Sequence, residues 1–443
     1  MIKLKVFGVV ATVVLCTLSA QSYGQTSQES LKMTLEECLE YAKENSITLQ
    51  KAKLSIDSSA AEELSAKGAF LPTISGSVSQ SLNSYPLQQS SISNSSYNGS
   101  YGLDLSMTLY NGGSNRAQLS KSQLNSEIAN LALEEFENSL ELSITELYVE
   151  ILYAIEQITA AEFSLSLSEQ NEERGRAFLE VGSISKVDFA QLESATASSR
   201  YDVVVAQTQL SNLYVALKYL LEISHEVDLE VVEPTISEEL LMGIIPTTTE
   251  IYQVAIETRP EIQSSQLSIE SAKLDTTIAK SGYLPTLRLT AGTGINHSSS
   301  SSYDFSTQMR NNFSTSAGLS LSIPIFSGYK NRSAVSIAQN NLDAASLSHT
   351  QVEKDLYQTI ETLRNNAANA QAKFSVSEYM LQASQKSMEL TTEQYEVGFK
   401  STIELITEQD NFSQTQQEYL TNKYQLILNK ALLNYYKENI IKL

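Results

Sequence analysis

Apolar residues recur at spacings of three and four over two long stretches of this chain, from Asn115 to about Leu179 and from Asn331 to about Glu396. This period places the apolar side chains on one face of an α-helix and favours coiled-coil-like packing. At ~1.5 Å per residue, each stretch reaches on the order of 100 Å as a single helix. A shorter helical stretch follows each one, from about Ser185 to Leu221 and from about Ser401 to Asn439. We therefore expect two long antiparallel helical hairpins.

Four shorter segments change to a period of two, which indicates β-strands with one apolar face and one face of small polar residues. They form two predicted hairpins, at about 71–110 and about 285–326, whose loops are rich in serine, asparagine and glutamine. The loops run roughly from Asn83 to Asn98 and from Asn296 to Asn312. The apolar faces contain Ile74, Gly76, Val78 and Leu82; Tyr101, Leu103, Leu105, Met107 and Leu109; Leu287, Leu289, Ala291 and Ile295; and Ala317, Leu319, Leu321, Ile323 and Ile325. Strands of about ten residues with this alternation are typical of an outer-membrane β-barrel.

Four strands are few for a β-sandwich, the other fold with alternating strands, and too few for a closed barrel, since known barrels start at about eight strands. An open sheet edge cannot stand in lipid, so the chain must oligomerise to close its barrel. A trimer would supply twelve strands. Phe70 and Tyr283 at strand starts, with Tyr110 and Phe326 at strand ends, would then form one aromatic girdle at the membrane interface.

The pattern occurs twice along the chain. The turn at 180–188 matches the turn at 396–404, and each lies between two helical stretches. Its glycine, Gly182 or Gly398, is the natural place for the backbone to take a positive φ and end the first helix. A capping box then opens the return helix. The two boxes are Ser185 with Asp188 and Ser401 with Glu404.

The segments before the β-hairpins repeat as well. Capping boxes at Thr34 and Thr247 open a helix in each copy, and Leu-Pro pairs at 71–72 and 284–285 end it. Each repeat is expected to contain one helix, a β-hairpin, a long helix, a tip turn and a return helix. The first repeat spans 25–223 and the second spans 250–443. Residues 224–249 form a small mixed connector between them.

Residues 1–24 have the features of a secretory signal peptide, with two lysines, an apolar run and a small-residue cleavage site. Leu15 precedes Cys16, where lipoprotein processing needs a small residue, so a lipid anchor is not expected. Cys38 is then the one cysteine of the mature chain, and no intrachain disulfide can form.

The net charge of −21 excludes a nucleic-acid partner, because binding a phosphate backbone needs clustered lysine and arginine. His225, His297 and His349 are dispersed along the chain, with no carboxylate or cysteine at metal-ligand spacing. The sequence contains neither a phosphate-binding glycine loop nor a nucleophile elbow. We expect no enzymatic activity, no cofactor and no metal.

Taken together, the tandem repeats, the Leu-Pro junctions, the strand-to-helix exit at Ile323-Pro324-Ile325-Phe326 and the Val-Gly turns resemble the TolC-like outer-membrane efflux protein family. The resemblance covers essentially the whole mature chain. It implies a homotrimer with a twelve-stranded β-barrel in outer-membrane lipid, continued into a long periplasmic α-helical barrel. It also implies two partners, a periplasmic adaptor protein and an inner-membrane pump that supplies the energy.

The resemblance also assigns roles to residues at the two tip turns. The turn residues that would receive the helical hairpins of the adaptor are Val181, Gly182, Val397 and Gly398. In the family, a tyrosine, an arginine and an aspartate hold the closed tip, and the matching residues here are Tyr395, Lys400 and Asp188. Lysine is a point charge where arginine is a planar, bidentate donor, so the link would be looser. Glu404 matches the first acid of a cation-attracting constriction ring.

Three functions fit the sequence. The first is a passive exit duct, which carries solutes of a tripartite efflux pump across the outer membrane. The second is the outer-membrane factor of type I protein secretion. The third is a secreted coiled-coil scaffold or adhesin, which has no need of hairpins with lipid-facing alternation and aromatic ends. Those hairpins argue against the scaffold. We take the first function as our expectation, and the partner genes or a cargo assay would separate it from type I secretion.

Overall fold

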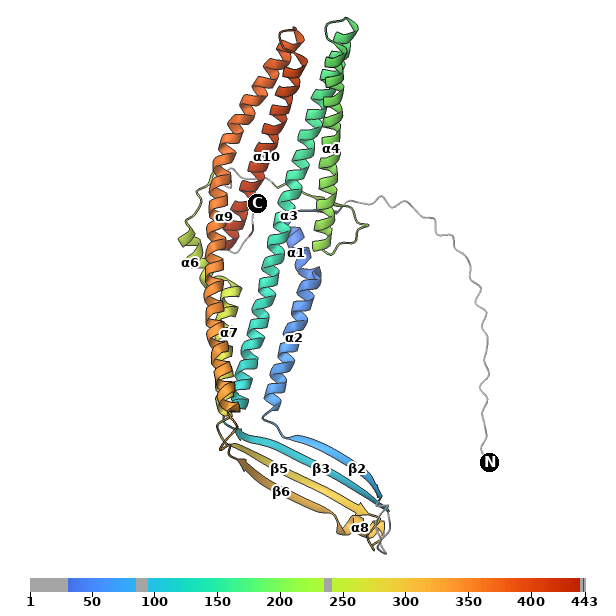
Figure 1. The fold of residues 1–443 in the computed structure, drawn as a ribbon, viewed down its shortest axis with the longest axis vertical. Helices are drawn as coiled ribbons and strands as arrows, with labels where there is room; N and C mark the ends of the chain where they lie inside the picture. The colour runs from blue at the N-terminus through green and yellow to red at the C-terminus, as the bar shows by residue number, and fades with distance from the viewer. Residues whose placement is uncertain (1–30, 85–94, 235–240, 439–440, 442–443) are drawn as a thin grey trace, which may run out of the picture.

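The computed structural model describes residues 31–84, 95–234, 241–438 and 441. It has a four-stranded sheet at one end and long helical hairpins that extend away from the sheet to the other end (Figure 1). This arrangement confirms the predicted mainly α-helical fold with a four-stranded β part in each chain. The signal peptide predicted at residues 1–24 lies outside the described residues.

The sheet joins the hairpins of the two repeats into one layer. Its strands are β2 (Thr73–Ser84), β3 (Ser95–Asn111), β5 (Thr286–Ser298) and β6 (Ser314–Ser322), and they are antiparallel in the order β2-β3-β5-β6. The central pair, β3 with β5, therefore connects residues of different repeats. The outer strands β2 and β6 each have one edge without a strand partner among the described residues.

The register gives the sheet an apolar face and a polar face. Ile74 pairs with Leu105, and Leu105 pairs with Ala291. Since paired residues of antiparallel strands point to the same side, the apolar rows of all four strands share one face. Within the protomer this face is uncovered, and Val78, for example, is 74% exposed. An apolar sheet face of this kind is the surface that lipid would cover.

The second β-hairpin differs from the prediction at its loop and at its last strand. The segment expected to be a loop contains the short helix α8 (Phe305–Asn311), which begins after Asp304, whose carboxylate accepts from two backbone N–H groups. Strand β6 ends at Ser322, so Ile323 and Ile325 lie beyond it. Pro324 between them has no N–H with which to continue a strand ladder.

The helix predicted before each β-hairpin is in fact two helices, so that prediction was wrong. The first copy has α1 (Leu35–Asn45) and α2 (Ile47–Gly68), and the second has α6 (Thr248–Thr258) and α7 (Pro260–Ser281). The break falls at Ser46 in the first copy, whose side chain caps α2. In the second copy it falls before Pro260, because proline is tolerated in the first turn of a helix but not in its interior.

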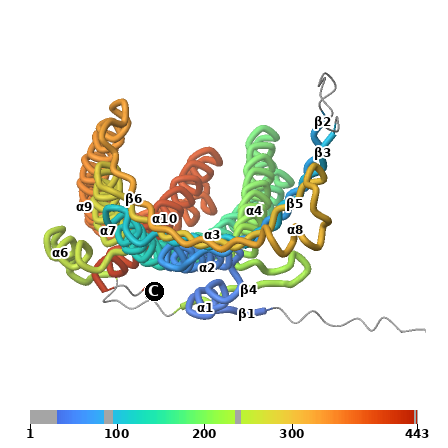
Figure 2. Tube along the Cα trace, turned by 90° about the horizontal axis from the view of Figure 1, so that it is seen from below, coloured from blue at the N-terminus to red at the C-terminus, as the bar shows by residue number. Residues whose placement is uncertain are grey.

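The long helices begin and end within about one residue of their predicted limits. They are α3 (Ser114–Glu180) and α9 (Lys330–Glu396), of 67 residues each, and the return helices are α4 (Lys186–Leu220) and α10 (Thr402–Glu438). Seen along the long axis, the helices form an open arc that continues the curve of the sheet (Figure 2). No helix in the described part of the chain is both long enough and apolar enough to cross a membrane.

A belt of short elements lies on one side of the arc of helices, near the middle of the long axis of the molecule (Figures 1 and 2). It contains α1, α6 and a parallel pair of strands, β1 (Leu31–Met33) with β4 (Leu229–Val231). The largest apolar core of the described chain lies beneath it and includes Cys38 and Ile151, both fully buried. Burial raises the pKa of the Cys38 thiol to about 12, so this cysteine is an unreactive core residue.

The second repeat fastens the C-terminal helix to the same belt. The guanidinium of Arg259, at the break between α6 and α7, lies 4.3 Å from the ring centre of Tyr435 and 4.4 Å from that of Tyr436. Its Nη2 also donates to the carbonyl oxygen of Tyr435 at 2.9 Å. Arg259 is only 4% exposed, so stacking and hydrogen bonding replace the water that its charge has lost.

Candidate functional site

Both tip turns are closed by the same backbone hydrogen bonds. Gly182 has φ +77° and Gly398 has φ +79°. The N–H after the first glycine, from Ser183, donates to the oxygen of Phe178 at 2.8 Å, and that of Phe399 donates to Gln394 at 2.9 Å. These six-residue closures need a left-handed residue at the glycine position, which explains why glycine occupies it in both copies.

The tip turns expose apolar side chains at the end of the molecule farthest from the sheet (Figure 1). Val181 is 75% exposed, Val397 is 68% exposed and Phe399 is 84% exposed. A Cβ atom added at Gly182 or Gly398 would meet no heavy atom within 4 Å. The residues predicted to contact the adaptor therefore lie in two exposed, apolar turns, which no other part of the described chain covers.

Each return helix begins with the predicted capping box. Asp188 accepts from the backbone N–H of Ser185 at 3.1 Å, and Glu404 accepts from that of Ser401 at 2.9 Å. In return, each serine hydroxyl accepts from the backbone N–H of the acidic residue. Both candidate carboxylates are thus held in place by the turn itself.

The structure pairs two of the candidate tip residues with each other. Lys400 Nζ lies 2.6 Å from Glu404 Oε1. Donation by Lys400, aided by the N–H of Ser401, lowers the pKa of Glu404 to about 2. No ion pair joins Lys400 to Asp188 within the described residues.

Tyr395, the third candidate gate residue, lies inside the tip instead of on its surface. It is 3% exposed, and its ring centre lies 5.8 Å from that of Phe178 on the other hairpin. Its hydroxyl lies 3.5 Å from Thr402 Oγ1. Tyr395 therefore connects α9 both to the start of α10 and to the end of α3.

A buried polar seam, which the sequence reasoning missed, joins the two hairpins further from the tip. Gln409 of α10 donates to Ser168 Oγ and, at 3.2 Å, to the Ser164 carbonyl oxygen, and it accepts from Asn171 Nδ2 at 3.1 Å. Ser168 Oγ also lies 2.9 Å from Ser199 Oγ on α4. The Ser168, Asn171 and Gln409 side chains are 3–5% exposed. Polar residues at core spacing within an apolar stripe were the one signal available in the sequence.

An ion pair continues this connection towards the tip. Arg174 Nη1 on α3 lies 3.0 Å from Glu396 Oε1 at the end of α9, and both side chains are more than a third exposed. Water screens such a pair, so its contribution to stability is small. Its geometry nevertheless shows that the ends of the two hairpins lie side by side in this protomer.

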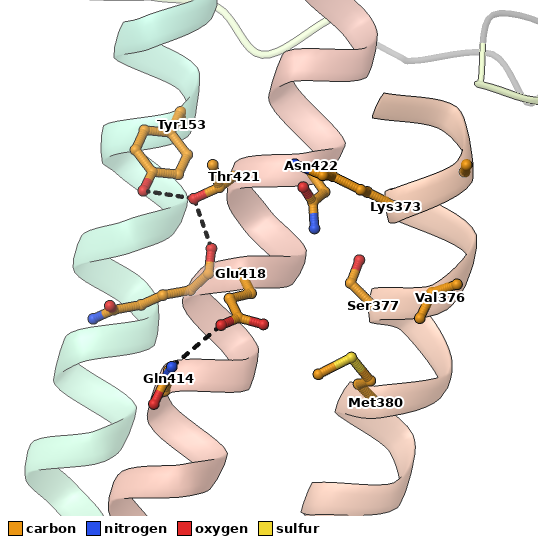
Figure 3. Close-up of a pocket in the computed structure, with 11 residues that line it drawn as sticks. Tyr153, Lys373, Val376, Ser377, Met380, Gln414, Glu418, Thr421 and Asn422 are labelled. Carbon is orange, nitrogen blue, oxygen red and sulfur yellow. Dashed lines mark hydrogen bonds between the residues drawn. The ribbon is translucent and has the colours of Figure 1, made fainter. Parts of the chain in front are cut away.

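A groove of about 620 Å³ runs between α3 and α9, with α10 as its floor (Figure 3). Tyr153 from α3 contacts Thr421 of α10, with 3.2 Å between the hydroxyl oxygens, and Gln414 donates to Glu418 at 3.2 Å. Met380 of α9 lies on the opposite side of the groove. Its lining mixes amides, hydroxyls and single charges with the apolar side chains of Ala372, Val376 and Met380.

The four predicted girdle aromatics are all exposed at the end of the sheet that joins the helices. Phe70 is 40% exposed, Tyr110 47%, Tyr283 51% and Phe326 78%. Their membrane position stays a prediction. Among the described residues, no three His, Cys, Asp or Glu side chains gather into a group that could hold a metal ion.

Known proteins share this sequence pattern. The family model described as "Outer membrane efflux protein" matches residues 38–221 and 251–434. The outer membrane efflux protein BepC of Brucella suis biovar 1 (strain 1330) is 21% identical over 415 residues, which cover 92% of this chain and 86% of BepC. The outer membrane protein TolC of Escherichia coli (strain K12) is 25% identical over 246 residues, 53% of this chain and 49% of TolC.

The fold is also that of a solved channel. The crystal structure of CusC, which forms a transmembrane channel, superposes with a TM-score of 0.79 at 19% identity, and the match covers 90% of this chain and 91% of CusC. At this sequence identity, the superposition shows only that the two chains share a fold. Since the family model matches both repeats, the chain belongs to the outer membrane efflux protein family, with its sheet in the outer membrane and its helical hairpins in the periplasm.

Proposed function

We propose that this protein is the exit duct of a tripartite efflux system, a homotrimer that conducts solutes passively from the periplasm to the exterior. The observation that carries the proposal is the continuity of the two parts. A sheet with one apolar face passes directly into hairpins of ~100 Å that end in bare glycine turns.

The sheet supports closure by three copies. Among the described residues, β2 and β6 each have one edge without a strand partner, and an open edge in lipid leaves backbone groups without hydrogen-bond partners. Pairing β6 of one protomer with β2 of the next removes every edge and gives twelve strands. The apolar rows then face lipid, and the rows of serine, threonine and glycine face a water-filled lumen.

The tips support recruitment by an adaptor. Val181, Val397 and Phe399 would each bury an apolar side chain against an incoming helical hairpin. Grooves lined by α3, α9 and α10 follow the same helices away from the tips and would extend the docking surface. We assign the energy for transport to an inner-membrane pump bound through that adaptor.

The test is the conductance of the purified full-length mature protein in a planar lipid bilayer, with its mass measured in detergent. We expect a trimer with discrete single-channel steps and a preference for cations. A monomer that leaves the bilayer silent would overturn the duct and favour a secreted scaffold.

A further inference from the structure

The polar face of the sheet carries almost no charge, although the chain as a whole has a net charge of −21. Its rows consist of serine, threonine, asparagine and glycine. Among the described residues of the four-stranded sheet (β2, β3, β5 and β6), the side chains that carry a full charge at neutral pH are Asp104 on β3 and Arg288 on β5. These two charges therefore stand out in a neutral, hydroxyl-lined surface.

The register places both charges on the polar face. Asp104 pairs with Ser75 and with Gly292, in the row next to the apolar row of Leu105. Arg288 pairs with Thr108 and with Ser320. Since neighbouring residues of a strand point to opposite sides, Asp104 and Arg288 both point away from the apolar face.

Neither charge is neutralised by the chain. No ion pair or hydrogen bond to the side chain of Asp104 or Arg288 occurs within the described residues, and both residues are exposed. Glycines make room for the Asp104 carboxylate, since a Cβ at Gly292 would lie 3.0 Å from its Oδ1 and one at Gly102 would lie 3.7 Å from its Oδ2. Glycine has no side chain with which to bind the carboxylate, so the carboxylate is open to solvent.

The two charges are also separate from each other. The row of Asp104 and the row of Arg288 are four residues apart on β3, which is about 13 Å along the strand. This distance exceeds the Debye length of about 10 Å at 0.1 M salt, so the fields of the two rows remain distinct. Arg288 lies nearer the helices, because β5 begins at Thr286.

We propose that Asp104 and Arg288 are the charge-selecting residues of the barrel lumen, where three copies of each form an anionic ring and a cationic ring. The proposal rests on the proposed trimeric duct. A small solute that leaves the periplasm meets the Arg288 ring first and the Asp104 ring second. The first ring holds back cations and the second holds back anions, most strongly at low ionic strength.

The test uses single cysteines as probes of the local potential, in protein reconstituted in lipid vesicles. The mature chain is expected to keep one native cysteine, Cys38, which is buried and has a thiol with a raised pKa, so it does not compete with the probes. Two methanethiosulfonate reagents of similar size, one cationic and one anionic, are reacted with each probe. The measured quantity is the ratio of the cationic rate to the anionic rate.

The Ser75→Cys probe lies directly opposite Asp104, at a Cβ separation of about 5 Å. Adding Asp104→Asn should lower its ratio about tenfold at ~10 mM salt and less than about twofold at ~1 M. A matched probe on the same face, Ser79→Cys, lies about 13 Å away and should change less than about twofold. Asp104→Ser is a second neutralising variant, in case the asparagine variant fails to form trimers.

Arg288 is tested in the opposite direction. Ser320→Cys pairs with Arg288, and adding Arg288→Gln should raise its ratio about tenfold at ~10 mM salt. An Ile74→Cys probe on the apolar face should react with neither reagent, because lipid covers it.

Two failures are distinguishable. If Ser75→Cys and Ser320→Cys react but their rate ratios do not change when Asp104 and Arg288 are replaced, the charge-selecting role is wrong. The proposed duct would still stand. If the serine-face probes are silent and Ile74→Cys reacts, the polar face does not line a lumen, and the proposed duct is overturned as well.

Discussion

Lys400 pairs with Glu404, one turn further along the chain, with 2.6 Å between Nζ and Oε1. The family resemblance assigns the same lysine to Asp188 as a link of the closed tip. One ammonium group on a flexible side chain cannot hold both carboxylates in full, so the two pairs compete. We therefore propose that Glu404 competes with Asp188 for Lys400.

This competition predicts opposite effects at the tip. Lys400→Ala and Asp188→Ala should each raise single-channel conductance, because the closed link is lost. Glu404→Gln should lower it, because Lys400 is released to Asp188. Adding Asp188→Ala to Glu404→Gln should restore the conductance of the Asp188→Ala protein, as expected for coupled residues. A double variant as poorly conducting as Glu404→Gln alone would show that Glu404 acts only by its charge.

The pH dependence of conductance follows from the same pair. The pKa of Glu404 is lowered from 4.5 to about 2, chiefly because Lys400 donates to it. A carboxylate with a lowered folded-state pKa keeps its contribution above the ordinary value and loses it as pH falls through the folded value. The wild-type tip should therefore conduct equally from pH 8 to about 5 and change only below about 4. In Lys400→Ala the change should begin at higher pH, and coincident profiles would contradict the pairing.

The backbone conformation of the tip-turn glycines predicts the effect of a proline substitution. Gly398 has φ +79° and its N–H donates to the Tyr395 oxygen at 3.0 Å. Proline fixes φ near −65° and has no N–H, so Gly398→Pro must reshape the turn. We expect it to abolish pump-dependent resistance while trimers still reach the outer membrane. Normal resistance would show that the turn does not contact the adaptor.

Gly398→Ala is a milder change, which separates the effect of the backbone conformation from the effect of side-chain size. A Cβ at Gly398 would contact no atom within 4 Å, so Gly398→Ala should not clash. It should lower the stability of the hairpin by about 1 kcal/mol, because alanine disfavours the left-handed backbone conformation. Gly68→Ala also meets open space but lies at the end of α2 with an ordinary φ, and it should be neutral or stabilising. Thermal dissociation of the trimer on gels measures both variants.

The sequence located the long helices well because their signals are local. Between Ser114 and Glu180 the apolar stripe is broken by no proline, and Gly182 marks the end. Other features depend on partners far away in the chain. Gln409 binds Asn171 across 238 residues, and β1 forms only because β4 lies beside it. The residues near each segment do not identify these distant partners, although the polar residues of the seam do interrupt an apolar stripe. The break between α1 and α2 at Ser46 was not predicted for a different reason, because a serine in a helix-forming context also fits a continuous helix.

The polar seam predicts a loosening of the two hairpins. Gln409→Leu would leave Asn171 Nδ2 and Ser168 Oγ without that partner in a buried site, at a cost of about 1–3 kcal/mol for each group. We expect a lower dissociation temperature and a higher conductance than wild type. Gln417→Leu, an exposed change two turns further along α10, is the matched control. A seam variant that behaves like this control would mean that the apolar contacts alone hold the hairpins together.

The clamp at Arg259 predicts that its shape matters more than its charge. Lysine keeps the charge but cannot place a flat group against the rings of Tyr435 and Tyr436 while donating to the Tyr435 carbonyl. Since Arg259 is 4% exposed, Arg259→Lys would also bury a strongly hydrated ammonium, and we expect a loss of about 2 kcal/mol. Arg332→Lys, at an exposed position on α9, should change nothing. Limited proteolysis of α10, compared between the two variants, measures the difference. Equal cleavage rates would mean that the C-terminal helix is held by its apolar face and that the guanidinium contributes no net stability.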